Sequence, residues 1–298
     1  MPRSITAVGA AIAAAALLAP AAAHAAPKPK PQLLVSLGDS YASGFQPTAK
    51  GKGSNTRNGF AYQVPKFAAK RGYDLKLVNF GCGGATTKSL IATKGCAKAA
   101  RGPGGEAYSS TQATAAVKFL KANRKRVGVI TVSIGGNDVT KCAGEADAVT
   151  CVGEAAKGIN TNLKALLKRL RAAAGPKVRI VGITYPDVIL GAWLTDDAGK
   201  QLAGLSQIAF KSIINPALKA RYEAVGGSFV DVTDATGGYD SLDTRVSDPA
   251  LSAEPVPANV KRVCDLTFYC QFGDIHARTE GYALIAELVA KALPRRKG

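Results

Sequence analysis

Histidine is almost absent from this chain of 298 residues, which contains only His24 and His276. His24 lies in an N-terminal stretch that we expect to be removed, so a single histidine would remain. The cysteine spacing Cys-x-x-Cys, typical of zinc sites, is also missing. The sequence therefore argues against a metal centre built from histidine and cysteine.

The sequence also lacks internal repeats and any interior stretch that resembles a linker between domains. Beyond the expected leader about 270 residues remain, a normal length for one α/β domain with elaborated loops. The net charge is +18, but lysines and arginines are spread along the chain and form no aromatic-rich basic patch. Nucleic-acid binding is therefore not expected. An anionic lipid or an acidic wall polymer would suit this charge, and solubility alone is the alternative explanation.

Residues 1–25 have the pattern of a secretory signal peptide. Arg3 is followed by an uncharged, alanine-rich run over 7–23, and Ala23-His24-Ala25 is typical of a cleavage site. Pro20 interrupts the run, which disfavours an uncleaved membrane anchor. Residues 26–32 alternate lysine with proline and predict an extended basic leader. We expect a secreted, extracellular protein with one folded domain at 33–294 and a basic tail at 295–298.

Six cysteines remain in the exported part of the chain, an even number that indicates disulfides in an oxidising compartment. Fifteen pairings are possible for six cysteines. Spacing favours the local one, which joins near neighbours: Cys82 with Cys96, Cys142 with Cys151, and Cys264 with Cys270.

Strand and helix patterns alternate along the chain. Apolar runs predict strands at 33–37, 75–80, 127–134, 178–184 and 228–232, and amphipathic patterns predict helices at 59–70, 106–122, 159–174, 199–225 and 279–293. Strands joined by single helices require right-handed crossovers and a parallel sheet that is covered on both faces. The expected fold is a three-layer α/β/α sandwich with a five-stranded parallel sheet.

Three strand ends and one loop carry residues suited to chemistry. The first strand ends in Gly38-Asp39-Ser40, where open α/β sheets bind ligands, and Ser40 would begin a helix with a free N–H. The second ends in a glycine-rich stretch at 81–84, and the third in Gly135-Gly136-Asn137-Asp138. Each of these is also ordinary turn material, so none is specific by itself. His276, just before the last helix, is the one histidine available as a base.

Together these stretches resemble the SGNH or GDSL hydrolases, secreted and intracellular esterases and lipases with a flavodoxin-like fold. Gly38-Asp39-Ser40 is similar to the first block of that family, Gly84-Ala85-Thr86 to the second, Gly135 to Asp138 to the third, and His276 to the fifth. The resemblance covers about 33–290, and the three local cysteine pairs are similar to those of the secreted actinobacterial branch.

The resemblance implies a serine ester hydrolase that needs no metal or organic cofactor. Ser40 would be the nucleophile and His276 the base, and the oxyanion hole would consist of Ser40, Gly84 and Asn137. We expect a monomer acting on a small-molecule or lipid ester. A polysaccharide or cell-wall O-acetyl esterase is the alternative, and a non-catalytic surface-binding protein a more distant one. Trp193 is a candidate for the acyl pocket and equally for the core.

The sequence departs from the family at one position. The family places an aspartate three residues before the histidine, where this chain has Gly273, and Asp274 follows at two residues before. In an extended segment this shift would turn the carboxylate away from the ring, and the Gly273 carbonyl would then accept from the histidine. A bend at Gly273 would instead bring Asp274 under His276, and we expect Asp274 to be the partner.

Overall fold

The computed structural model describes residues 1, 4 and 31–296. Most of the expected signal peptide (1–25) and basic leader (26–32), and residues 297–298 of the expected tail, lie outside these residues. Among the described residues, no helix combines the length and the apolar composition needed to cross a membrane.

Five parallel strands form the centre of the domain: β1 (Gln32–Gly38), β4 (Leu75–Asn79), β5 (Val127–Ser133), β6 (Arg179–Ile183) and β7 (Ser228–Val230). Their order across the sheet is β4-β1-β5-β6-β7. Counted along the sheet strands alone, this order is 2-1-3-4-5, that of flavodoxin-like folds. The predicted five-stranded parallel sheet is confirmed.

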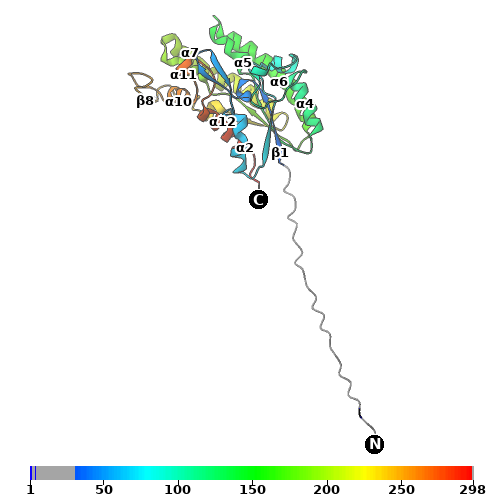
Figure 1. Ribbon diagram of the computed structural model, residues 1–298. Helices are drawn as coiled ribbons and strands as arrows, with labels where there is room; N and C mark the ends of the chain where they lie inside the picture. Colours follow the sequence, from blue (N-terminus) through cyan, green and yellow to red (C-terminus); the bar gives the residue numbers. More distant parts are fainter. Residues whose placement is uncertain (2–3, 5–30, 297–298) are drawn as a thin grey trace. The chain divides into compact units, whose positions relative to one another are not determined.

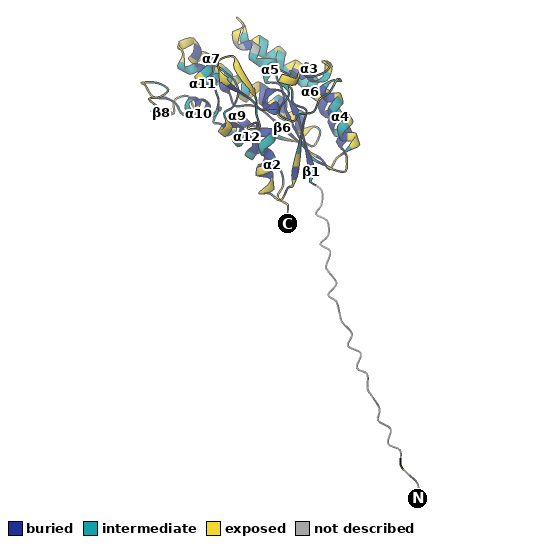
Figure 2. Ribbon diagram, viewed as in Figure 1, coloured by how far each residue is buried: buried dark blue, intermediate teal, exposed yellow. Residues whose placement is uncertain are grey.

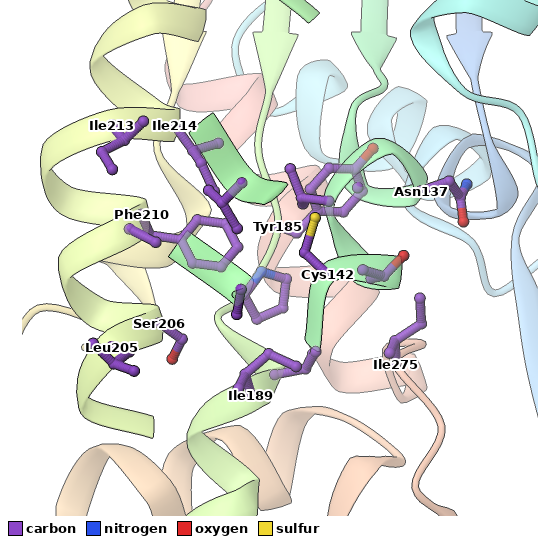
Figure 3. A pocket seen from close by; sticks show the side chains of 18 of the residues that line it. Asn137, Cys142, Tyr185, Ile189, Leu205, Ser206, Phe210, Ile213, Ile214 and Ile275 are labelled. Atoms are coloured by element: carbon purple, nitrogen blue, oxygen red, sulfur yellow. The ribbon is translucent and has the colours of Figure 1, made fainter. Parts of the chain in front are cut away.

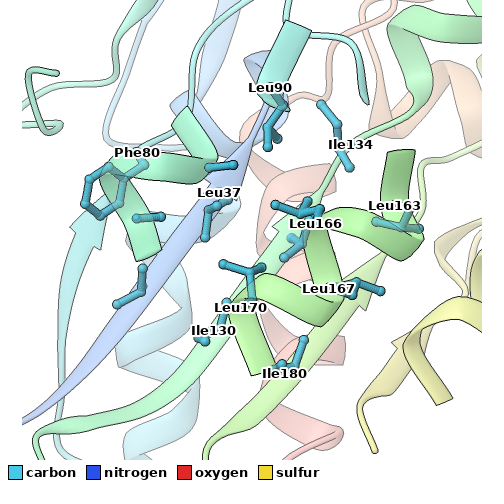
Figure 4. Close-up of a cluster of buried hydrophobic side chains, with 14 of the residues drawn as sticks. Leu37, Phe80, Leu90, Ile130, Ile134, Leu163, Leu166, Leu167, Leu170 and Ile180 are labelled. Carbon is cyan, nitrogen blue, oxygen red and sulfur yellow. The ribbon is translucent and has the colours of Figure 1, made fainter. Parts of the chain in front are cut away.

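Alternate side chains of β1 enter two separate cores, because successive side chains on a strand point to opposite faces. Leu33, Val35 and Leu37 pack in the core formed with α4 (Gln112–Ala122), α6 (Ala148–Ala174) and α8 (Asn215–Glu223) (Figure 4). Leu34 packs on the other face against α2 (Phe60–Ala69) and α12 (Thr279–Lys291). Figure 1 shows α4 and α6 on one side of the sheet and α2 and α12 on the other, and Figure 2 shows that the strands are buried between them. The three-layer prediction is therefore confirmed.

Short elements surround the sandwich. A hairpin of β2 (Phe45–Ala49) and β3 (Lys52–Asn55) follows α1 (Ser40–Ser43), and a smaller ladder joins β8 (Arg245–Val246) to β9 (Val256–Pro257). Other helices and helical turns are α3 (Thr87–Ala92), η1 (Lys98–Ala100), α5 (Gly136–Val139), η2 (Thr140–Gly144), η3 (Val188–Leu194), α9 (Val232–Ala235), α10 (Ala258–Leu266) and α11 (Tyr269–Phe272). The sequence prediction contained neither the β2–β3 hairpin nor α10.

Three predicted helices differ from the structure. The helix expected at 106–122 begins at Gln112, because Thr111 caps it by accepting a hydrogen bond from the Thr114 N–H. The helix expected at 159–174 begins at Ala148, because Asp147 caps it by accepting a hydrogen bond from the Thr150 N–H. The single helix expected at 199–225 consists of α7 (Asp197–Ala209), a π-helical turn η4 (Phe210–Ile214) and α8. Such π-helical turns are frequent at functional sites, and this one borders the cavity described below.

Candidate active site

Ser40 stands at the carboxyl edge of the sheet because β1 ends abruptly at Gly38. The backbone of Gly38 has φ of +141°, and a Cβ there would lie 2.0 Å from the carbonyl oxygen of Ser133 on β5. Gln112 fixes this turn by accepting from the Gly38 N–H and donating to the Gly38 carbonyl. The next residue, Asp39, caps α1, so Ser40 begins a helix at the point where the strand stops.

Three side chains form a chain of hydrogen bonds at this edge. Ser40 Oγ lies 2.7 Å from His276 Nε2, and His276 Nδ1 lies 2.6 Å from Asp274 Oδ1. Ser40 is only 7% exposed, and the side chains of His276 and Asp274 are 12% and 20% exposed. Residues separated by 236 positions in the sequence therefore meet in the order hydroxyl, imidazole, carboxylate, which is the arrangement that activates a serine nucleophile.

Asp274 reaches the ring because the segment before His276 is bent. Gly273 ends α11 in the left-handed region at φ of +66°, a conformation that glycine adopts without the Cβ clash of other residues. Asp274 Oδ1 also accepts from the backbone N–H of His276 at 2.9 Å, which closes a turn of the Asx type. The carboxylate thus lies beside both the backbone and the ring of His276, as expected for a bend at Gly273 and not for an extended segment.

Interactions with His276 favour the ionised form of Asp274. Partial burial raises the pKa of this carboxyl, but the hydrogen bonds from the ring and backbone of His276, together with the charge of the ring, bring the net pKa below its ordinary value. The carboxylate is therefore charged near neutral pH and can stabilise a protonated imidazole.

Tyr41, which follows Ser40 on α1, connects the serine to the histidine loop. Its hydroxyl donates to the carbonyl of Ile275 at 2.6 Å. Its ring packs edge-on against Tyr185 and Tyr282, and the ring of Phe45 lies 4.6 Å from that of His276. The sequence analysis missed this role of Tyr41, because a tyrosine beside a turn carries no sign of a partner 234 residues away.

Asp39 is a second buried carboxyl behind the serine, and it is only 1% exposed. Burial raises its pKa to about 6, although its Oδ2 accepts from the Tyr185 hydroxyl at 2.6 Å and its Oδ1 from the Tyr41 N–H at 2.9 Å. Both oxygens are thus bonded to groups that hold α1 in place, so Asp39 fixes the position of the serine backbone.

Two further strand ends lie next to Ser40 and are tied together. Asn137, on α5 after β5, donates from Nδ2 to the carbonyl of Ala85 at 2.9 Å. The neighbouring Asp138 carboxylate accepts from the N–H of Thr87 at 2.9 Å and from its hydroxyl at 2.6 Å. These contacts fix the glycine-rich turn after β4 relative to the turn after β5, the two turns in which the sequence predicted oxyanion donors.

Donors suited to an oxyanion remain available here. Within the described residues 31–296, neither the Ser40 N–H nor the Gly84 N–H donates a hydrogen bond to the protein. Gly84 is exposed. Asn137 uses one hydrogen of its amide for Ala85 and has a second one to offer. Free donors of this kind stabilise the negative charge that develops on a carbonyl oxygen under attack.

An apolar cavity of about 160 Å³ opens beside Ser40 and Asn137. It extends between the start of α6 and the segment from α7 through η4, and Figure 3 shows Phe210, Ile214 and Leu205 from that segment along one side. Its lining includes Val152, Tyr185, Ile189 and Ile275. Val149 and Ile208, each 60% exposed, line its mouth. The cavity therefore offers an apolar chain a path from solvent to the serine.

Trp193 does not line this cavity. It packs in a separate cluster with η3 and α10, and the guanidinium of Arg245 lies 4.7 Å from its ring. Of the two alternatives for Trp193, a place in the acyl pocket or in the core, the structure supports the core.

The three disulfides have the predicted local pairing, and each borders the site. Cys82–Cys96 closes the loop that carries Gly84, Cys142–Cys151 joins η2 to α6 at the cavity wall, and Cys264–Cys270 joins α10 to α11 just before Asp274. Disulfides of this kind hold loops in the geometry that a site requires.

The described part of the chain contains no group of three or more histidine, cysteine, aspartate or glutamate side chains placed to hold a metal ion. The donors around Ser40 are N–H groups and one amide, which suit an anionic oxygen and not a cation.

Comparison with known proteins agrees with this architecture. The sequence matches the GDSL-like Lipase/Acylhydrolase family over residues 36–284. An extracellular lipase from Streptomyces rimosus superposes with a TM-score of 0.53 at 18% identity, covering 88% of this chain and all of that one. A lipase from a goat rumen metagenome gives a TM-score of 0.50 at 16% identity, covering 88% of this chain and 97% of that one. No curated protein matches the sequence. At these identities the two structures support the fold, while the match over residues 36–284 shows that the chain belongs to the GDSL-like lipase/acylhydrolase family.

Proposed function

We propose that this protein is an exported serine hydrolase that cleaves carboxylic esters of apolar acyl chains. The observation that carries the proposal is the hydrogen-bonded series Ser40–His276–Asp274, whose serine lines an apolar cavity. The family match supports hydrolysis of an ester. Export is supported by the three disulfides, which persist in oxidising compartments.

In the proposed reaction His276 Nε2 takes the proton of Ser40 while the Ser40 oxygen bonds to the ester carbonyl carbon. The resulting oxyanion accepts hydrogen bonds from the N–H groups of Ser40 and Gly84 and from the amide of Asn137. When the intermediate collapses, the carbon–oxygen bond to the alcohol breaks, and the alcohol leaves with the proton held by His276. Water then attacks the acyl-Ser40 ester, with His276 again as base, to release the carboxylic acid and restore the serine.

The cavity lining supports an acyl chain longer than acetyl as substrate. Burying one methylene of the chain contributes about 0.8 kcal/mol, and the side chains along the path, such as Val152, Phe210 and Ile214, are apolar. An acetyl group would leave most of this surface unused. The cavity therefore favours an esterase or lipase activity over the alternative O-acetyl esterase.

A panel of p-nitrophenyl esters from acetate to long acyl chains tests the proposal, with Ser40→Ala as the blank. We expect kcat/KM to rise with chain length up to the size of the cavity. A fluorophosphonate probe should label Ser40 in the parent protein and nothing in Ser40→Ala. Labelling of another serine, or equal hydrolysis by Ser40→Ala, would refute the assignment.

The chain-length preference itself has a separate test. Val152→Phe places a larger side chain at the cavity wall, so we expect long-chain esters to lose activity while acetate retains it. Thr161→Phe, at an exposed position further along the same helix, is the matched control. Uniform loss on all esters in Val152→Phe would show that Val152 does not line the acyl site.

A further inference from the structure

A second hollow lies at the end of the domain opposite the candidate active site. It has a volume of about 560 Å³, and its lining includes the first residues of three parallel strands: Gln32 of β1, Val127 of β5 and Arg179 of β6. All strands of the sheet run the same way, so this amino edge lies across the sheet from Ser40. Figure 1 shows β1 starting at the end of the domain away from α5 and α7.

Five cationic side chains line this hollow: Arg124, Lys125, Lys177, Arg179 and Arg296. All five residues are exposed, and no aspartate or glutamate is among the described residues that line the hollow with them. None of the five forms an ion pair with a described carboxylate. Within residues 31–296, no carboxylate therefore pairs with the positive charge gathered here.

The surroundings of the hollow hold part of this charge in place. The Arg296 guanidinium lies 3.9 Å from the ring centroid of Tyr73 and donates to Gln32 Oε1 at 2.6 Å. The pKa of Arg171 is lowered by its burial and then by the positive charge of Arg179. Positively charged side chains that are held close together repel one another, and a bound anion would relieve that repulsion.

The shape and chemistry of the hollow discriminate among anionic partners. A planar bilayer does not enter a concave site, and the most exposed large apolar side chains within 31–296, Val149 and Ile208, lie at the mouth of the other cavity. Proteins bind single-stranded nucleic acids by stacking the bases on exposed aromatic side chains. Tyr73, the one aromatic residue among the lining, is only 4% exposed and is covered by Arg296. A flexible chain of negative charges without bases fits these conditions.

We propose that this hollow, lined by Arg124, Lys125, Lys177, Arg179 and Arg296, binds a linear phosphate-bearing polyanion. Three of the five cations are arginines, whose planar guanidinium groups donate pairs of hydrogen bonds to phosphate oxygens. The polymer would be an attachment site and not a substrate, because it binds at the edge of the sheet opposite the serine. An enzyme attached in this way would keep its acyl cavity open to solvent.

Fluorescence anisotropy with labelled inorganic polyphosphate tests the proposal, using the full secreted chain at 50 and 200 mM salt. Arg124→Gln/Lys177→Gln/Arg179→Gln removes three cations from the hollow. The control Lys50→Gln/Lys52→Gln/Lys88→Gln removes the same charge from exposed positions elsewhere. We expect binding of the parent to weaken about tenfold or more between the two salt concentrations. The hollow variant should bind at least about tenfold more weakly than the parent at 50 mM salt, and the control should change by less than about twofold.

Equal weakening in both triple variants would assign the binding to overall charge and overturn the proposal. Equal affinity of the parent for polyglutamate would overturn the choice of phosphate, and loss of binding to phosphatidylglycerol vesicles in the hollow variant alone would make a lipid surface the partner. The absence of polyphosphate binding by the parent at 50 mM salt would also refute the proposal. If thermal unfolding shows that the triple variant is not folded, the single variants Lys177→Gln and Arg179→Gln replace it.

Discussion

Tyr41 connects the two loops whose meeting creates the candidate site. Its backbone N–H donates to the Asp39 carboxylate, and its hydroxyl donates to the backbone carbonyl of Ile275, the residue before His276. One side chain on the nucleophile helix thus holds the loop that carries the base. A small movement of that loop would lengthen the hydrogen bond between Ser40 and His276, on which proton transfer depends.

Tyr41→Phe should therefore lower kcat with little change in KM. Removing the hydroxyl leaves the Ile275 carbonyl without this donor, at a cost of about 1–3 kcal/mol, and we expect a loss of about tenfold in kcat. Steady-state kinetics on one p-nitrophenyl ester measures both constants. Tyr222→Phe is the control, since that buried hydroxyl donates to the carbonyl of Val132 and not to the histidine loop. Equal losses of kcat in the two variants would reduce Tyr41 to a general packing role.

Asp274→Asn tests whether the carboxylate orients His276. An amide in place of the carboxylate favours the wrong tautomer of the ring, and a comparable change in another serine hydrolase lowers kcat about 10⁴-fold. We expect a loss of about 3 to 4 orders of magnitude near neutral pH. Asp265→Asn, at an exposed carboxylate that pairs with Lys261, serves as the control. A loss of less than about tenfold in Asp274→Asn would transfer the role to a backbone carbonyl.

At the residue scale, local patterns in the sequence pointed to the candidate site residues but not to most of the side chains that position them. Ser40, Asn137 and His276 follow strands or precede a helix, so local patterns place them at one edge of the sheet. The side chains of Gln112, Tyr41 and Tyr185 position the site through hydrogen bonds to residues that are 74, 234 and 146 positions away in the sequence, respectively. No local pattern contains such contacts, because they arise only when the sheet is assembled.

At the scale of elements, long periodic segments were predictable and short or irregular ones were not. The five sheet strands are short apolar runs, a strong local signal, and β1, β4 and β5 each end at a glycine or within two residues of one. The β2–β3 hairpin contains Pro47 and Gly53, residues that weaken strand patterns. The π-helical turn η4 interrupts the helix expected at 199–225, and the one local sign of an interruption is Pro216, which lacks a backbone N–H and lies at the start of the next helix.

The disulfides permit a prediction at this same scale. In the chain-entropy account, a disulfide that closes a longer loop stabilises the folded state more. The expected stabilisation is about 3 kcal/mol for the 14-residue separation of Cys82–Cys96 and about 2 kcal/mol for the 6-residue separation of Cys264–Cys270. Cys264–Cys270, however, lies directly before Asp274 and His276. We expect Cys264→Ala/Cys270→Ala to lose less thermal stability but more kcat than Cys82→Ala/Cys96→Ala. Melting temperature and kcat measured on both variants check this, and the opposite order of kcat losses would show that the disulfide does not position the histidine loop.

At the scale of the whole molecule, the domain has two ends of different chemistry. The carboxyl edge of the sheet carries the serine and an apolar cavity, while the amino edge carries five cations that form no ion pair with a described carboxylate. Composition alone gave only the net charge of +18. It could not place the cations. Arg124 and Lys177 meet because β5 and β6 begin at the same edge, and Arg296 joins them through its contacts with Tyr73 and Gln32.

Buried carboxyls make the stability of the whole domain depend on pH. Asp187 is 0% exposed, and burial raises its pKa from 3.8 to about 7, since the hydrogen bond from Ser206 to Oδ2 and the nearby N–H groups of Ile189 and Leu190 offset only part of the effect. The folded state therefore holds this proton more tightly than the unfolded state. Stability from this group is fully present below pH 3.8 and is lost as the pH rises to about 7.

Asp187→Asn removes this titration while keeping an oxygen that can accept from Ser206. Any change in packing or hydrogen bonding caused by the amide is independent of pH, so only the pH-dependent part of the difference reports the carboxyl. Relative to the parent, the variant should gain about 3 kcal/mol of unfolding free energy between pH 5 and pH 8, because about two pH units of titration at about 1.4 kcal/mol each disappear. Urea unfolding at the two pH values measures the difference. Asp243→Asn is the control, because its carboxylate also accepts from a serine hydroxyl but is exposed to solvent. A constant difference between Asp187→Asn and the parent at pH 5 and pH 8 would mean that Asp187 titrates alike in the folded and unfolded states, so that burial at this position does not penalise the charge.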